Sequence, residues 1–344
     1  MKRLVAVIAA VAMIGVAWWI RTSFIDSSDS GDGSGNAGGE LRLTCGSDLA
    51  EVCHALAAED DSIRVSVVAE GTTADALSNE GARAGFDAWL TAGPWAQIVR
   101  DNRSTRSAGG ADPLGTTTKA LGRSPVAFVG PDDRIAALRA HCGGSVTWSC
   151  LGDASGQPWS AVGGSPTWGT VKAGLAPPDS GAGLVALDQA VADRSGHPDW
   201  DAADLDDVDA FMSQLVGSAS LSADPLNVLF TQPGSFSVAA PLQQQAGPGL
   251  AANPAGSRFG TLYPEPVVTG DVTLTAAAGR DSADVLGRIG EDRLATILAK
   301  NGWRGTGTTN AAGIDNAPPL PPNSNLTTPG ALQALREQWK QWRG

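Results

Sequence analysis

Residues 41–58 read LRLTCGSDLAEVCHALAA and divide into a strand, a turn and a helix. Leu41–Thr44 alternates apolar and polar side chains, as a half-buried strand does. Gly46 interrupts this alternation, and Ser47 is a favourable cap for a helix that reaches Ala58. The apolar residues of this helix fall on one face: Leu49, Val52, Cys53 and Leu56. Because a strand that leads at once into a helix is the unit of parallel sheets, the stretch predicts an α/β fold.

The same alternation of short apolar runs and helical patterns continues along the chain. Predicted strands cover Ile63–Val68, Phe86–Leu90, Val126–Val129, Val146–Cys150, Val171–Leu175, Leu226–Phe230, Leu262–Val268 and Val272–Ala276. Predicted helices begin at Ala74 and Pro94 and cover Pro131–His141, Gly181–Asp193, Asp206–Val216 and Ala283–Asn301. Strands that alternate with helices in this way indicate largely parallel sheets covered by helices.

The composition limits the classes of protein to which the chain can belong. Its 344 residues are 42% hydrophobic, which suffices for a sizeable core and excludes a fully disordered chain. The net charge is −12, so the phosphate backbone of a nucleic acid would be repelled. The sequence contains no serine-hydrolase, metalloprotease or P-loop motif. We therefore expect no catalytic residue, no metal site, no cofactor and no nucleic-acid partner.

The N-terminus has the pattern of a membrane anchor. Lys2 and Arg3 precede Leu4–Ile20, a run that is apolar throughout and long enough to span a bilayer. The two positive charges favour a cytoplasmic N-terminus, so the chain after this run would lie outside the membrane. We predict a transmembrane signal-anchor over residues 1–25 and a Gly/Ser linker over residues 26–39. A cleaved signal peptide, which would release a secreted protein, is the alternative.

The four cysteines form two pairs whose members lie eight positions apart in the sequence, although four cysteines allow three pairings. An oxidising compartment outside the cell favours disulfides, so we predict the local bonds Cys45–Cys53 and Cys142–Cys150. Four buried free cysteines are the alternative. Zinc is disfavoured because no Cys-x-x-Cys spacing occurs.

Four passages of the chain occur in an order that is typical of one family. They are the strand and helix at 41–58, the strand at 86–92 with Asp87, the strand at 123–129, and the helix at 294–304 with its Gly302-Trp303 pair. In this order and spacing they resemble the type 2 periplasmic binding proteins, the solute-binding subunits of ABC importers, and especially their molybdate- and phosphate-binding branch.

This resemblance implies an α/β fold with two lobes that close at a hinge over a small solute, preceded here by the N-terminal transmembrane helix. It implies a first lobe made of residues 40–124 plus 262–305 and a second lobe made of residues 125–261. A Pro-rich linker at 306–328 follows the lobes, and residues 329–344 form a separate C-terminal helix.

In such folds a ligand lies where the carboxyl ends of strands meet the N-termini of helices. Unpaired backbone N–H groups at these ends can hold an oxyanion without Lys or Arg. By resemblance, Ser47 and either Thr72 or Thr73 match positions where the molybdate-type family places hydroxyl groups on its ligand. Further candidate ligand-binding residues are Ser180, Gln232 and Tyr263. Plain helix capping is the alternative role of the Ser and Thr side chains.

The class of ligand stays open at the level of the sequence. Asp48 and Asp179 each place a carboxylate beside one of the proposed donor loops, which counts against an anionic ligand. We predict an oxyanion narrowly over a neutral polar solute, and a domain that has lost binding is the third alternative.

The C-terminal helix is amphipathic and follows Thr328, a favourable cap. Its apolar stripe consists of Leu332, Leu335, Trp339 and Trp342. The stripe can dock on the protein's own body, on a partner such as an ABC permease or another envelope protein, or on the outer membrane surface.

Two functions are consistent with these features. The first is an extracytoplasmic, membrane-anchored solute-binding protein that captures a small solute between its lobes for ABC-type import. The alternative is a membrane-tethered sensor or cell-envelope interaction protein that uses the same fold without transport. Both place the chain in the cell membrane as a single-pass protein with its domain outside, and neither is an enzyme.

Overall fold

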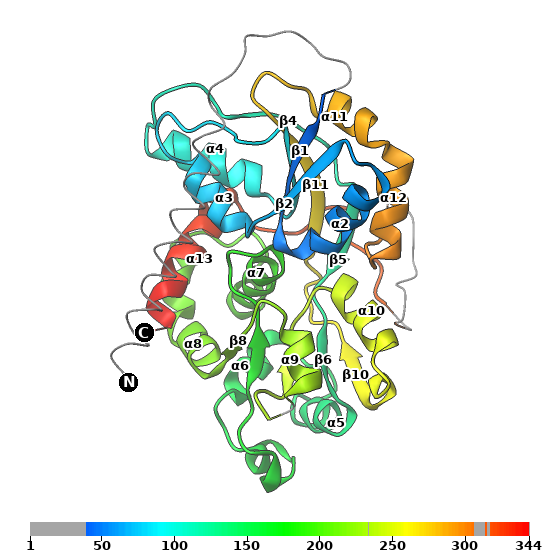
Figure 1. The fold of residues 1–344 in the computed structure, drawn as a ribbon. Helices are drawn as coiled ribbons and strands as arrows, with labels where there is room; N and C mark the ends of the chain where they lie inside the picture. Colours follow the sequence, from blue (N-terminus) through cyan, green and yellow to red (C-terminus); the bar gives the residue numbers. More distant parts are fainter. Residues whose placement is uncertain (1–38, 233, 306–313, 315–316, 344) are drawn as a thin grey trace, which may run out of the picture.

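The computed structural model describes residues 39–232, 234–305, 314 and 317–343, and its strands form two sheets (Figure 1). We refer to each sheet together with the helices packed on it as a lobe. The first sheet has the strand order β2-β1-β3-β11-β4, and β5 pairs with the other end of β11. Its strands are β1 (Leu41–Cys45), β2 (Ile63–Val67), β3 (Ala88–Ala92), β4 (Leu114–Thr117), β5 (Gly122–Pro125) and β11 (Thr269–Ala277). β1 is parallel to β2 and β3, whereas β11 is antiparallel to its neighbours.

The second sheet has the order β10-β6-β9-β7-β8. Its strands are β6 (Phe128–Pro131), β7 (Ala173–Leu175), β8 (Ser220–Leu221), β9 (Val238–Ala239) and β10 (Phe259–Leu262). β7 is parallel to β8 and β9, while β6 is antiparallel to β9 and β10. Both sheets are therefore mixed, with three adjacent parallel strands on one side of each, β2-β1-β3 and β9-β7-β8, whereas the sequence predicts largely parallel sheets in its α/β fold.

Helices flank both sheets. Those of the first lobe are η2 (Ser47–Leu49), α2 (Ala50–Glu59), α3 (Glu70–Leu77), α4 (Trp95–Thr105), α11 (Ser282–Ile289) and α12 (Glu291–Lys300). Those of the second lobe are α5 (Asp132–His141), α6 (Trp148–Ala154), η3 (Trp159–Val162), η4 (Pro166–Trp168), α7 (Gly181–Ser195), α8 (Asp204–Ser218), α9 (Pro225–Thr231), α10 (Gln243–Ala252) and η5 (Gly256–Arg258). The last helix, α13 (Pro329–Trp342), packs against α4, α7 and α8 and so contacts both lobes.

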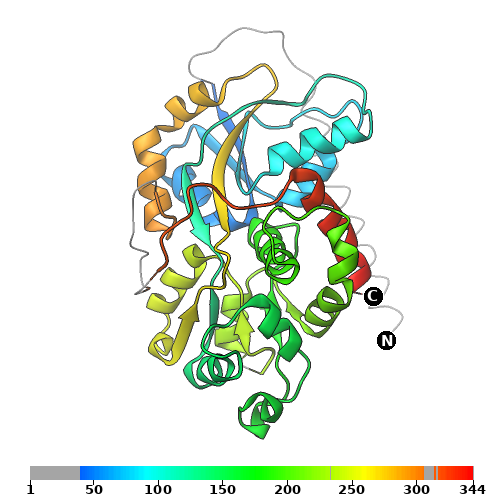
Figure 2. The same ribbon diagram turned by 180° about the vertical axis from the view of Figure 1, so that it is seen from behind.

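The chain passes between the lobes at two places, from β5 to β6 and from β10 to β11. We call the region of these two connections the waist. A third segment, residues 317–328, crosses the waist on the side that faces the viewer in Figure 2 and leads to α13. It is attached there, because the Ser324 carbonyl accepts a hydrogen bond from the Thr269 N–H at 2.9 Å. The Asn325 side-chain amide also donates to the Val267 carbonyl at 3.0 Å. The lobe boundaries given by the resemblance, at 124/125 and 261/262, remain predictions.

Both predicted disulfides are confirmed. Cys45–Cys53 joins the end of β1 to α2, and Cys142–Cys150 joins the end of α5 to α6. The predicted anchor over 1–25 lies outside the described residues, as does the linker over 26–39 apart from Gly39. In the described part of the chain, no helix is both long and apolar enough to cross a bilayer.

Two predicted strands, Val146–Cys150 and Leu226–Phe230, are wrong, because α6 begins at Trp148 and α9 contains all of Leu226–Phe230. The Thr147 hydroxyl caps α6 by accepting from the Cys150 N–H at 3.2 Å. α9 has Pro225 at its first position, and the Asp224 carboxylate caps it by accepting from the Asn227 N–H at 2.9 Å. These capping signals outweigh the β-branched and aromatic residues that suggested strands.

Several element boundaries also differ from the prediction, and three of these differences affect the description that follows. α3 begins at Glu70 rather than Ala74, so the Gly-Thr-Thr run lies inside the helix and not before it. The strand placed at Leu262–Val268 is wrong in position, since β10 ends at Leu262. Gly290, with a φ of +89°, divides the predicted helix Ala283–Asn301 into α11 and α12, because only glycine adopts this backbone conformation readily.

Helix α7 lies at the contact between the lobes. All of its residues from Gly181 to Ala192 are buried. It packs against α6 and α8 of the second lobe and against η2, β3 and β11 of the first. Its N-terminus therefore faces the first lobe at the place where the sequence predicts a ligand.

Candidate functional site

The N-terminus of α7 is occupied by a carboxylate from the opposite lobe. The Ser180 hydroxyl caps the helix by accepting from the Gly183 N–H at 3.0 Å. The next free N–H of the helix, that of Ala182, donates to Asp48 Oδ2 at 2.7 Å. A carboxylate is a favourable partner at a helix N-terminus, where the helix dipole is positive. Asp48 therefore fills the position in which the sequence placed an oxyanion.

Asp48 is held by further polar groups of the second lobe. The Gln245 side chain donates to Asp48 Oδ1, and the Gln244 side chain donates to the Asp48 carbonyl, both at 3.4 Å. Burial raises the pKa of Asp48 from 3.8 to about 6, although the hydrogen bonds from the Ala182 and Gly181 N–H groups act in the opposite direction.

Glu70 lies beside Asp48 and is fully buried at the start of α3. Its Oε2 accepts from the Ser47 N–H at 3.2 Å and from the Ser47 hydroxyl at 3.1 Å. Its Oε1 has no hydrogen-bond partner among the described residues. Burial, and secondarily the charge of Asp48, raise the pKa of Glu70 from 4.5 to about 8. Burial thus favours the protonated, neutral form of the Glu70 side chain, which carries no negative charge into the contact between the lobes.

Glycine residues allow the two lobes to approach closely at this point. The Gly71 N–H of α3 donates to the Asp179 carbonyl of the second lobe at 2.8 Å. A Cβ on Gly181 would lie 2.2 Å from the Ala92 carbonyl oxygen of β3. We call this contact, made by residues 46–48 and 70–73 with residues 179–183, the seam. The described structure is thus a closed arrangement in which protein atoms fill the space between the starts of α3 and α7.

The structure brings four of the predicted binding residues to the seam. Ser47 hydrogen-bonds Glu70, and Ser180 caps α7. Thr73 is buried, and its hydroxyl has no hydrogen-bond partner within the described ranges. Thr72 is on the same turn of α3 but is exposed. The capping role proposed as the alternative is observed for Ser180, and the binding roles of all four residues remain predictions.

The other two predicted residues lie elsewhere. Gln232 ends α9, is exposed, and accepts from the Ser235 hydroxyl at 3.5 Å. Tyr263 follows β10 and packs against an apolar cluster of the second lobe that includes Leu229 and Phe236. Its hydroxyl is buried without a hydrogen-bond partner in the described part of the chain, and this burial raises its pKa. Neither side chain contributes to the seam, and their binding roles are untested.

Asp48 and Glu70 are the seam residues that the sequence prediction missed as site residues. Asp48 was recognised only as an argument against an anion. Glu70 was missed because the predicted helix began four residues too late, which placed Glu70 between two elements. A helix beginning at Glu70 gives this carboxylate a position at the positive end of the helix, which is the signal that could have identified it.

A pocket of about 330 Å³ opens beside the seam and is lined by both lobes. The first lobe contributes residues of η2, α2 and α12, and the second contributes the two residues before α9 and residues of α10. Its polar lining consists of Ser47, Asp48, Glu51, Asp224, Gln244, Gln245, Lys300 and Asn301. Three of these side chains are carboxylic acids and one is a lysine, so the pocket is acidic in balance.

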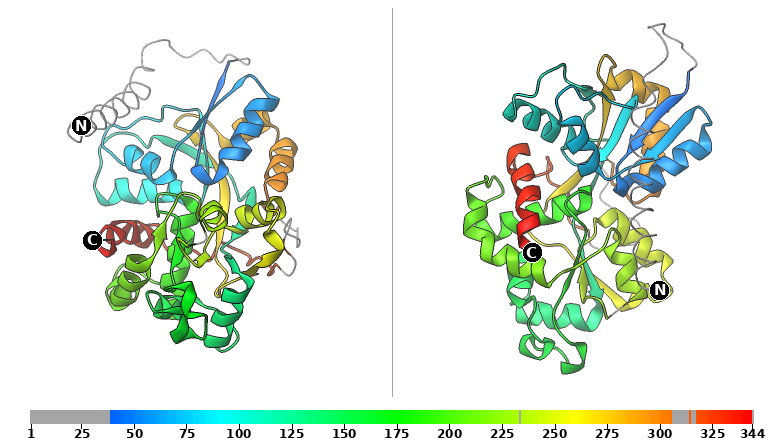
Figure 3. Two further views of the ribbon diagram at one scale, coloured as in Figure 1. Left: turned by 60° about the horizontal axis from the view of Figure 1, so that its bottom comes forward. Right: turned by 60° about the vertical axis from the view of Figure 1, so that its left-hand side comes forward.

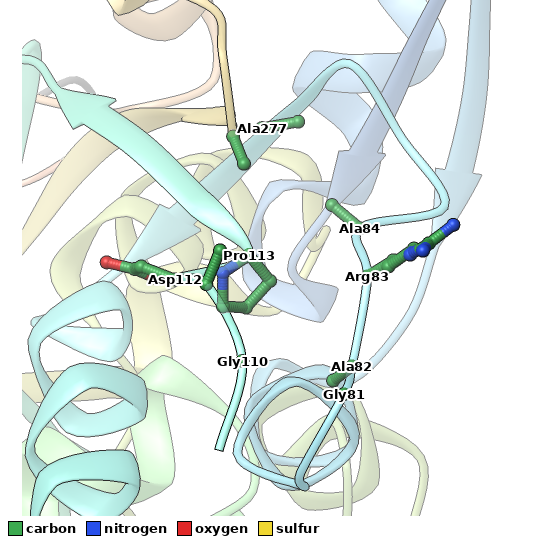
Figure 4. Close-up of a pocket in the computed structure, with 10 residues that line it drawn as sticks. Gly81, Ala82, Arg83, Ala84, Gly110, Asp112, Pro113 and Ala277 are labelled. Carbon is green, nitrogen blue, oxygen red and sulfur yellow. The ribbon is translucent and has the colours of Figure 1, made fainter. Parts of the chain in front are cut away.

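A second hollow, of about 440 Å³, lies at the end of the first lobe that is remote from the seam (Figure 4). Its walls are mostly glycine, alanine and proline. The two charged side chains of its lining, Arg83 and Asp112, point away from the space between the walls (Figure 4). Since no polar groups converge there, we do not treat it as a binding site.

The fold is similar to solved structures of periplasmic binding proteins. The periplasmic thiamin binding protein shares 12% identity, with coverage of 92% of this chain and 100% of that chain and a TM-score of 0.55. The fructose-6-phosphate-bound periplasmic binding protein AfuA from Actinobacillus pleuropneumoniae shares 12% identity. The match covers 89% of this chain and 97% of that chain, with a TM-score of 0.53. The ferric binding protein from Campylobacter jejuni shares 10% identity. The match covers 88% of this chain and 97% of that chain, with a TM-score of 0.52.

No family model matches the sequence, and no curated protein matches it. The likeness is therefore one of structure. Together with the strand order of the first sheet, it shows that the chain has the type 2 periplasmic-binding-protein fold.

Proposed function

We propose that the chain is an extracytoplasmic solute-binding protein that captures a small solute between its lobes and delivers it to an ABC-type importer. The observation that carries this proposal is the pocket beside the seam, because both lobes line it. A solute held there touches both lobes at once, so its binding free energy favours the closed arrangement over an open one. The thiamin, fructose-6-phosphate and ferric binding proteins with the same fold support this class of function.

The N-terminal anchor belongs to the same proposal. The apolar run Leu4–Ile20 would tether the lobes to the outer face of the membrane, with residues 26–39 as a spacer. Such a tether keeps the binding protein close to the importer.

For the solute we propose a polar molecule that is neutral or carries a cationic group. The oxyanion predicted from the sequence would have to displace Asp48 from the N-terminus of α7. The pocket beside it contains Asp48, Glu51 and Asp224 against the single cation Lys300. This balance of charge repels an anion and attracts a cation.

Isothermal titration with a panel of organic cations, neutral sugars and oxyanions tests the proposal. We expect heat of binding from at least one cationic or neutral compound, and none from sulfate, phosphate or molybdate. Tight binding of an oxyanion would show that Asp48 leaves α7 and would restore the prediction made from the sequence. If no compound of the panel gives heat of binding, the proposed transport function is contradicted.

Replacing Glu51 with Gln should weaken the binding of a cationic solute by about threefold to tenfold, because one pocket carboxylate loses its charge. The matched control is Glu59→Gln, at the other end of α2, where the side chain is also exposed. Titration of both variants at low salt gives the comparison. Equal effects of the two substitutions, or tighter binding by Glu51→Gln, would contradict the cationic assignment.

The alternative function, a tethered sensor or envelope interaction protein without transport, is favoured by one observation. The seam is filled by the protein's own Asp48 and Glu70, so the lobes close without any solute between α3 and α7. Under this alternative the titration panel is silent, and the closed shape itself is the surface that a partner recognises.

A further inference from the structure

The C-terminal helix α13 bridges the two lobes. Figure 3 (right) shows it lying between α4 of the first lobe and α8 of the second. The apolar stripe predicted from the sequence is buried against these helices: Leu332 and Leu335 fully, Trp339 and Trp342 almost fully. Of the docking surfaces that the sequence left open, the protein's own body is the one observed, and binding of this stripe to a permease, an envelope protein or the membrane is unsupported.

One side chain of α13 joins both lobes through charge. Arg336 Nη1 and Nη2 lie 2.9 and 3.2 Å from the two carboxylate oxygens of Asp75 in α3. Nη2 also lies 2.8 Å from Asp179 Oδ1, immediately before α7. The guanidinium stands over the ring of Trp95 in α4, 5.3 Å from its centroid. The Arg336 side chain is only 5% exposed, whereas the side chains of Asp75 and Asp179 are 58% and 56% exposed, so solvent screens these ion pairs in part.

The charges around Arg336 make it a link between the lobes. Asp75 and Asp179 belong to opposite lobes, and both point at the same guanidinium. Without that guanidinium, no cation would stand between these two carboxylates of opposite lobes. Planar bidentate pairing of the kind seen with Asp75 is a geometry that Arg provides and Lys does not.

The two ends of α13 are attached separately. At its C-terminal end, Trp342 Nε1 and Gln338 Nε2 donate to Asp209 Oδ1 of α8, at 2.8 and 3.2 Å. At its N-terminal end, the segment before it is attached at the waist between the lobes: the Thr327 N–H donates to buried Asp188 of α7 at 3.3 Å. The helix is thus fixed near the waist and reaches across the line along which the lobes would separate.

We propose that α13 is a clasp that holds the lobes closed in the absence of solute, with Arg336 as the residue that sets the balance between closed and open forms. Opening the lobes must separate Arg336 from Asp75 or from Asp179 and must expose part of the apolar stripe of α13. The clasp concerns the motion of the lobes alone and does not depend on the identity of any solute.

The experiment measures the distance between the lobes by spin-label spectroscopy on the full chain without solute. The native cysteines of the described chain are all in disulfides, so labels at Ala58→Cys in α2 and Ala252→Cys in α10 are selective. We expect one short distance in the labelled parent protein. Arg336→Met should add a longer distance and raise the open population about tenfold. Arg336→Lys should give an intermediate result.

The control is Lys340→Met, which removes a cation from an exposed position one turn along the same helix and should leave the distance unchanged. An unchanged distance in folded Arg336→Met protein would overturn the proposal. If that variant does not fold, the pair Asp75→Asn and Asp179→Asn provides the test, because it leaves α13 itself intact. If the Arg336→Met protein is open but binds no solute, the result supports the clasp and contradicts only the proposed transport function.

Discussion

Raising the pH from 6 to 8 should lower the free energy of unfolding by about 2–5 kcal/mol. The cause is a pair of fully buried carboxyl groups, Glu70 in the seam and Asp188 in α7, whose pKa values burial raises to about 8. In the unfolded chain these groups titrate near 4.5 and 3.8. Between those values and 8 the folded protein binds more protons than the unfolded chain, so its stability falls as the pH rises.

Asp188 illustrates how a neutral carboxyl is accommodated. Its Oδ1 accepts from Trp200 Nε1 at 3.1 Å and from the Thr327 N–H at 3.3 Å. Its Oδ2 has no hydrogen-bond partner within the described residues and is the oxygen that would carry the proton. Asn at this position keeps the shape and the acceptor but cannot ionise.

Urea unfolding at pH 6, 7 and 8 measures the effect. Glu70→Gln and Asp188→Asn should each flatten the decline by roughly half, and the double variant should abolish most of it. Glu80→Gln, at an exposed position after α3, serves as the control and should behave as the parent protein does. Equal unfolding midpoints at pH 6 and pH 8 in the parent protein would show that these carboxyl groups ionise freely.

The second large effect is expected from Gly181→Val, which should prevent the lobes from closing and abolish solute binding. A Cβ at this position would lie 2.2 Å from the Ala92 carbonyl oxygen and 2.9 Å from the Ala92 Cβ, both in β3 of the first lobe. Backbone of the opposite lobe cannot move aside locally, so the clash is relieved by separation of the lobes. Because the clash lies between the lobes and not within either sheet, we expect a folded but open protein.

Small-angle X-ray scattering and titration together measure this outcome. The radius of gyration should increase relative to the parent protein, and binding should weaken at least a hundredfold. Gly217→Ala in α8 is the control, because a Cβ there meets only the Trp342 carbonyl oxygen, at 3.9 Å. A Gly181→Val protein that binds solute with parental affinity would show that the ligand does not lie between the lobes.

Much of the fold could be predicted from local signals in the sequence. Residues 41–58 form the predicted strand and helix. Helices α7 and α13 begin directly after their capping residues, Ser180 and Thr328. Both disulfides were predicted from the spacing of the cysteines in the sequence and from the oxidising compartment outside the cell. Short elements were less predictable: in α6 and α9 a single cap decides the outcome against the intrinsic preferences of the residues.

The candidate site was harder to predict because its properties arise between elements distant in sequence. Nothing local to Asp48 shows that the start of α7 will accept its carboxylate, more than a hundred positions away. The protonation of Glu70 depends on burial that only the packed lobes produce. The amphipathic pattern of α13 predicted a docked helix, whereas its position across both lobes depends on where residues 317–328 run.

The crystal structure of the protein with its tightest-binding solute is the most direct test of two lobes that close on a solute. We predict that the solute occupies the pocket beside the seam, in contact with Glu51 of the first lobe and with Asp224 or Gln245 of the second. A solute bound to one lobe only, or at a site away from the contact between the lobes, would contradict it.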